Sequence, residues 1–125
     1  MVVQVVLVHG IRTSATMWRS QVAYLERRDT PVVAVDLPGH GSRRGEEFTL
    51  DGAFETIDAA VRDAAVRGPV LLVGHSMGGL LCIEYVGAEA APPVAGFIAP
   101  GGAAVVASIR TITGGGASRA GIAVA

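Results

Sequence analysis

The chain has 125 residues, which suits a single domain, and half of them are hydrophobic while only 17% are charged, so a disordered chain is excluded. The net charge is −1 and the ten basic residues are all arginines, mostly scattered along the sequence, so we expect no nucleic-acid partner. The single cysteine, Cys82, excludes an intramolecular disulfide and is expected to pack as a small buried hydrophobe.

Strands and helices are predicted to alternate over most of the chain. The predicted elements are a strand over 2–8, a helix over 16–28, a strand over 31–36, a helix over 49–67, a strand over 70–74, a helix from 77 to about 87 and a strand over 94–99. The strands are short, apolar and rich in β-branched residues, and the helices carry apolar stripes such as Trp18, Val22 and Leu25. This alternation predicts an α/β fold with a parallel sheet covered by helices on both faces and right-handed crossovers.

The pattern stops after residue 99. Of the last 25 residues, 13 are Ala or Gly, so 1–99 is assigned to the domain and 100–125 to an Ala/Gly-rich tail of uncertain structure. The uncharged stretch 90–109 is long enough to cross a bilayer, but its prolines and glycines argue against a continuous helix. The N-terminus lacks the basic segment and cleavage site of a signal peptide. We therefore expect no membrane span and a cytoplasmic location.

A serine lies at the junction of a buried strand and a buried helix. The segment GHSMG, from Gly74 to Gly78, fits the pattern G-x-S-x-G in the strand-to-helix position that a nucleophile elbow requires. So tight a turn lifts the Ser76 hydroxyl clear of the sheet and leaves no room for side chains two residues away on either side. The alternative is a glycine-rich turn in which Ser76 caps the helix through its side chain.

Three segments together resemble the α/β-hydrolase superfamily: VVLVHG after the start, VDLPGHGS after the second strand and GHSMGG at the serine. The likeness covers about 2–99. It implies that Ser76 is the catalytic nucleophile and that the backbone N–H groups of Ile11 and Met77 form the oxyanion hole. It also implies elbow and loop roles, without direct chemistry, for His9, Gly10, Gly74, His75, Gly78 and Gly79. The His75 side chain is expected to point away from the substrate.

The sequence departs from the family pattern after the elbow. In this superfamily the acid and then the histidine of the triad follow the nucleophile, but here the last acidic residue is Glu89 and no histidine follows His75. Asp36 and His40 match structural loop positions and no catalytic one. We therefore expect a partial α/β-hydrolase fold, an N-terminal half that lacks the C-terminal strands. Its strand over 94–99 would then be an uncovered edge through which the chain could self-associate.

The function expected from these observations is a serine hydrolase that acts by acyl transfer on an ester or related small carboxylic substrate, incomplete in this chain. The alternative is a non-catalytic remnant that binds a small ligand or a partner; a third interpretation has a second polypeptide supply the acid and the histidine. Serine at the elbow argues against dehalogenase and epoxide-hydrolase chemistry, while esterase, lipase, thioesterase, amidase and C–C hydrolase stay open. No cofactor or metal is expected, and no nucleotide-binding glycine motif is present.

Overall fold

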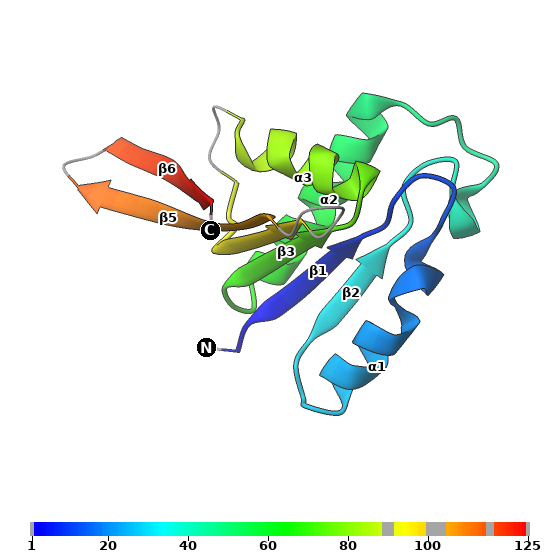
Figure 1. The fold of residues 1–125 in the computed structure, drawn as a ribbon, viewed down its shortest axis with the longest axis horizontal. Helices are drawn as coiled ribbons and strands as arrows, with labels where there is room; N and C mark the ends of the chain where they lie inside the picture. Colours follow the sequence, from blue (N-terminus) through cyan, green and yellow to red (C-terminus); the bar gives the residue numbers. More distant parts are fainter. Residues whose placement is uncertain (1, 89–91, 100–104, 115–116, 125) are drawn as a thin grey trace.

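The computed structural model describes residues 2–88, 92–99, 105–114 and 117–124 (Figure 1). Its strands form one sheet in the order β2-β1-β3-β4-β5-β6. The strands are β1 (Gln4–Val8), β2 (Val32–Val35), β3 (Val70–Gly74), β4 (Gly96–Ala99), β5 (Val105–Gly114) and β6 (Ala117–Val124). The first four pair in parallel, whereas β5 pairs antiparallel with β4 and with β6.

Helices cover both faces of the parallel part of the sheet (Figure 1). They are α1 (Arg19–Glu26), α2 (Leu50–Ala65) and α3 (Met77–Val86), with short 3-10 turns η1 (Ala15–Trp18) and η2 (Gly41–Arg43) in the loops. The predicted α/β class with a parallel sheet is confirmed. The first helix differs from the prediction, because its expected first turn is the 3-10 turn η1 and the α-helix begins only at Arg19.

Side chains of β1 alternate between two apolar cores. Val6 and Val8 face a core shared with α2 and α3, while Val5 and Leu7 face a smaller core beneath α1 that includes Trp18. Burial on both faces explains why the sequence of this strand is an uninterrupted apolar run. Cys82 is fully buried in the larger core, as expected, and burial raises the pKa of its thiol well above the ordinary value.

The order of the strands reverses at β1. The chain passes from β1 to β2 on one side and then returns past β1 to β3 on the other, and the two connections use helices on opposite faces. The loops that leave the carboxyl ends of β1 and β3 therefore run to opposite sides and diverge. In open parallel sheets ligands bind at such a point, where the strand order reverses, so we expect a ligand site at the carboxyl ends of β1 and β3.

The prediction of an uncovered β4 edge is wrong for the described residues. Phe97, Ile98 and Ala99 of β4 pair antiparallel with residues 105–107 of β5, which extends the sheet into the segment to which the sequence assigned no element. The tail has no clear hydrophobic period, so its strands depend on pairing with β4 and with each other. The uncharged stretch 90–109 lies partly outside the described residues. No described helix has the length and apolar content needed to cross a bilayer.

Candidate active site

The turn from β3 into α3 holds Ser76 in a strained backbone conformation. Its φ of 55° and ψ of −117° lie in a region that residues with side chains avoid. Ser76 is exposed, and its side chain makes no capping hydrogen bond to α3. The alternative in which the serine serves as a side-chain helix cap is therefore wrong, and the hydroxyl is free to meet a molecule from solvent.

Glycines on either side of Ser76 are required by contacts with backbone. A Cβ on Gly74 would lie 2.5 Å from the carbonyl oxygen of Gly78, across the turn itself. A Cβ on Gly78 would lie 2.6 Å from the carbonyl oxygen of Val8 and would also collide with that of His9. Backbone atoms held in a helix or at the end of a strand cannot easily move aside, so both positions exclude larger residues. The elbow is thus pressed directly against the end of β1.

The loop after β1 lies beside the elbow. A Cβ on Gly10 would be 3.3 Å from the Cβ of Ser76 and 3.1 Å from the carbonyl oxygen of His75, so this glycine also permits a close approach. Next in the loop, Ile11 is 59% exposed. Among the described residues, the backbone N–H groups of Ile11 and Met77 have no hydrogen-bond acceptor. One of these unpaired donors, on Met77, directly follows the serine in sequence, and the other, on Ile11, directly follows the glycine that packs against it.

His9 is a buried strut between the first two loops. Its side chain is 0% exposed, and its Nε2 accepts a hydrogen bond from the N–H of Leu37 at 3.0 Å. Its Nδ1 lies 2.8 Å from the carbonyl oxygen of Gly10, which can only accept, so the proton is assigned to Nδ1. Burial lowers the pKa of His9, which is consistent with a neutral ring. The structural role expected for His9 stays a prediction, which these contacts support.

Asp36 ties the loop after β2 to the loop after β1. Its carboxylate accepts hydrogen bonds from the N–H of Ala15 at 2.8 Å and from the N–H and hydroxyl of Ser42 at 3.1 and 2.7 Å. Burial alone would raise the pKa of Asp36, but these hydrogen bonds outweigh it and hold the pKa below the ordinary value. A carboxylate engaged in this way is a structural clamp.

The other two histidines make their described contacts with groups other than the serine hydroxyl. His40 places its Nδ1 3.0 Å from the carbonyl oxygen of Pro38, and its ring packs against His9 with centroids 5.0 Å apart. The Nδ1 of His75 is buried without a partner, and the ring lies edge-on to Trp18 at 6.5 Å. None of the three histidines hydrogen-bonds Ser76 within the described part of the chain, and no cluster of metal-binding side chains occurs there.

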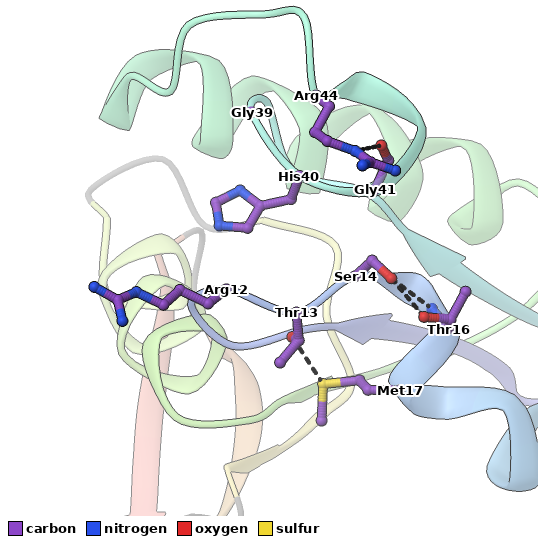
Figure 2. A pocket seen from close by; sticks show the side chains of 9 residues that line it. All are labelled: Arg12, Thr13, Ser14, Thr16, Met17, Gly39, His40, Gly41 and Arg44. Atoms are coloured by element: carbon purple, nitrogen blue, oxygen red, sulfur yellow. Dashed lines mark hydrogen bonds between the residues drawn. The ribbon is translucent and has the colours of Figure 1, made fainter.

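A pocket of about 470 Å³ opens between the loops after β1 and β2 (Figure 2). Its lining is polar and includes arginines and hydroxyls but no acidic residue: Arg12, Thr13, Ser14, Thr16, Met17, Gly39, His40, Gly41 and Arg44. Sequence analysis missed Thr13, whose hydroxyl donates to the carbonyl oxygen of Gly10 at 2.9 Å. Its position three residues after that glycine is the only sequence signal.

Comparison with known proteins identifies the family. The family model described as "Alpha/beta hydrolase family" matches residues 5–124. The chain belongs to the α/β-hydrolase family. Its elbow, glycines and divergent loops are then the local structure of a hydrolase fold, and the three sequence motifs at 9–10, 36–42 and 74–79 fall within the matched range.

Individual α/β-hydrolases resemble the chain over part of their length. Lipase LipV of Mycobacterium tuberculosis is 33% identical over 87 residues, which cover 69% of this chain and 32% of the lipase. Phospholipase YtpA of Bacillus subtilis is 33% identical over 105 residues, covering 75% and 38%. The crystal structure of a monoacylglycerol lipase from Paleococcus ferrophilus superimposes with a TM-score of 0.62 at 28% identity, covering 77% and 37%. The chain spans about a third of the length of these relatives.

Proposed function

We propose that Ser76 is the nucleophile of an acyl-transfer reaction on an ester or related small carboxylic substrate. The observation that carries this proposal is the strained, exposed serine at the strand-to-helix turn, whose side chain makes no capping hydrogen bond to α3. Strain of this kind persists where surrounding structure enforces it, which is typical of active sites. The relatives named as lipases and phospholipase support an ester as the substrate class.

In the proposed reaction the Ser76 Oγ attacks the carbonyl carbon of the ester and transfers its proton to a base. The carbonyl oxygen becomes an oxyanion, and its collapse breaks the bond to the alcohol, which leaves with a proton; water then hydrolyses the acyl-serine. The N–H groups of Ile11 and Met77 are proposed to donate to the oxyanion, an effect of a few kcal/mol per donor. Both donors are unpaired among the described residues, which supports this assignment.

The base and its acid are proposed to come from outside this chain's 125 residues. His9 and His40 are engaged with backbone groups, His75 is held against Trp18, and the sequence contains no further histidine. The proposed function therefore assigns to this chain the nucleophile and the oxyanion donors. The alternative is a binding module that keeps the pocket but not the reactivity of the serine.

Labelling with a fluorophosphonate probe tests the proposal, with imidazole added as the proton acceptor. Attack by the Ser76 Oγ forms an O–P bond, expels fluoride and passes the proton to imidazole. We expect imidazole-dependent labelling of the wild-type chain, detected by mass spectrometry on the peptide that contains Ser76. Ser76→Ala should abolish it, and Ser20→Ala, at an exposed serine of α1 remote in sequence, should not. Absence of labelling from the wild-type chain would favour the binding module.

A further inference from the structure

The carbonyl group of Gly10 accepts two hydrogen bonds from side chains. The Nδ1–H of His9 donates at 2.8 Å and the hydroxyl of Thr13 donates at 2.9 Å. These two donors use both lone pairs of the oxygen. A loop carbonyl can be satisfied by water alone, so two protein donors on one oxygen fix its direction.

The same peptide unit carries the N–H of Ile11. Because a peptide bond is planar and trans, its C=O and N–H point in opposite directions and turn together. Side chains that fix the Gly10 oxygen therefore fix the Ile11 N–H. Hydrogen bonds accepted by a carbonyl also polarise the peptide and strengthen its N–H as a donor.

We propose that Thr13 is a positioning residue for the oxyanion hole. Together with His9, it orients and polarises the Gly10–Ile11 peptide so that the Ile11 N–H can donate a hydrogen bond to the negatively charged oxygen. This inference rests on the proposed function and adds to it a residue with no counterpart in the three motifs. Thr13 does not touch the reacting atoms in this scheme and acts only through the peptide.

The two donors differ in how firmly they are held. His9 is fully buried and its ring is also bonded to the N–H of Leu37, so its hydrogen bond to the Gly10 oxygen is held rigidly. Thr13 is exposed, lines the pocket between the loops, and has the sulfur of Met17 3.4 Å from its hydroxyl (Figure 2). An exposed hydroxyl can be removed without opening the core, which makes Thr13 the position at which to test the support.

The residue after Ile11 also has a backbone conformation that its own side chain disfavours, as expected if the surrounding loop enforces it. Arg12 has a φ of 59°, in the left-handed region that favours glycine. The clamp from Asp36 to the N–H of Ala15 holds the far end of the same loop at 2.8 Å. The loop is thus fixed on both sides of the turn that carries the Ile11 N–H.

The test compares labelling rates of the full chain with fluorophosphonate and imidazole. Thr13→Val keeps the size of the side chain but removes the donor, and we expect labelling of Ser76 to slow about tenfold, less than the hundredfold or more for complete loss of an oxyanion donor. Thr13→Ser restores a hydroxyl and should restore most of the rate. The matched control is Thr30→Val, the same change in the loop before β2, at the opposite end of the sheet from the serine turn.

Carbonyl ¹³C and amide ¹⁵N NMR shifts supply a readout that general destabilisation does not move. Thr13→Val should shift the carbonyl signal of Gly10 and the amide signal of Ile11. Thr30→Val should leave both signals unchanged, even if the two variants unfold at the same temperature. Equal labelling of Thr13→Val and wild type overturns this inference while the proposed function stands. Absence of labelling from the wild type overturns the proposed function and this inference with it. Slow labelling that Thr13→Ser does not rescue overturns the role of the hydroxyl.

Discussion

The backbone at Ser76 is held in its conformation by neighbours that are not part of the turn. A φ of 55° on a residue with a side chain costs about 1–3 kcal/mol. The opposing contacts come from the close fit of Gly78 against the carbonyl oxygens of Val8 and His9 at the end of β1. The energy of this fit, and not the preference of the serine, decides where the hydroxyl points.

Substitution of Gly78 should therefore destabilise the fold far more than removal of the hydroxyl. Gly78→Val introduces a Cβ that would lie 2.6 Å from the oxygen of Val8, and we expect a loss of about 3 kcal/mol or more in the free energy of unfolding. Ser76→Ala removes an exposed group that makes no capping hydrogen bond to α3, and should change the free energy of unfolding by less than about 0.5 kcal/mol. Urea unfolding of both variants checks this; equal midpoints would contradict the fit of the elbow against β1.

At the scale of elements, the loops after β1 and β2 behave as one unit. Asp36 accepts three hydrogen bonds from Ala15 and Ser42, and His9 joins the same two loops through Leu37 and Gly10. The pocket lies between these loops. Its shape therefore depends on the connections between loops more than on either loop alone.

Loss of the Asp36 clamp should loosen both loops together. Asp36→Ala leaves the N–H of Ala15 and the N–H of Ser42 without their acceptor, and we expect a loss of about 2 kcal/mol in the free energy of unfolding. Amide hydrogen exchange should accelerate at both residues. As a comparison, Asp63→Ala removes only an exposed i,i+4 pair with Arg67 and should have little effect. Faster exchange in only one of the loops would contradict their coupling.

Sequence reasoning located the elbow because its determinants are local. The glycines, the strand before them and the helix after them all lie within one continuous segment, so spacing alone revealed the turn. The hydrogen bonds of Asp36 and Thr13 were not predicted, because the sequence does not distinguish a Thr or Asp that bonds to another loop from one that faces only solvent. Only the parallel register of β1 with β2, which pairs Val8 with Val35, brings those loops together.

At the scale of the whole molecule, stability is linked to pH through His9. The pKa of His9 is lowered by burial from its ordinary 6.5, so the unfolded chain binds a proton more readily than the fold does. The contribution of neutral His9 is present in full above about pH 6.5 and is lost as the pH falls from there towards the lowered value.

We expect the free energy of unfolding to fall below about pH 6.5, by no more than about 1.4 kcal/mol per pH unit for this single group. Urea unfolding between about pH 5 and pH 7.5 measures the slope. The pKa values of Asp36 and Asp58 are lowered, so these carboxylates affect stability only at more acidic pH. Within the measured range the change in stability is therefore expected to come from histidine. The variant His9→Asn should be less stable throughout but should lose the slope. A slope that persists in His9→Asn would show that another group is responsible.

The strands β5 and β6 are the part of the fold that the sequence did not predict. The periodicity of residues 2–99 predicted the parallel sheet and its helices, because buried strands and amphipathic helices leave distinct patterns. The sequences of β5 and β6 leave none, and the pairing of β5 with β4 follows from an edge that is open until another strand joins it. Such pairing is a property of the sheet's geometry, which no local window of sequence contains.

The dependence of the elbow on β1 has a consequence for protein engineering. A five-residue GHSMG segment transplanted between a strand and a helix of some unrelated scaffold would relax into an ordinary helix start. The recipient would also have to supply a neighbouring parallel strand whose last carbonyl groups press on the second glycine, as Val8 and His9 do here. The transferable unit is thus a pair of adjacent strands, β1 and β3, which are far apart in the chain, and not a peptide.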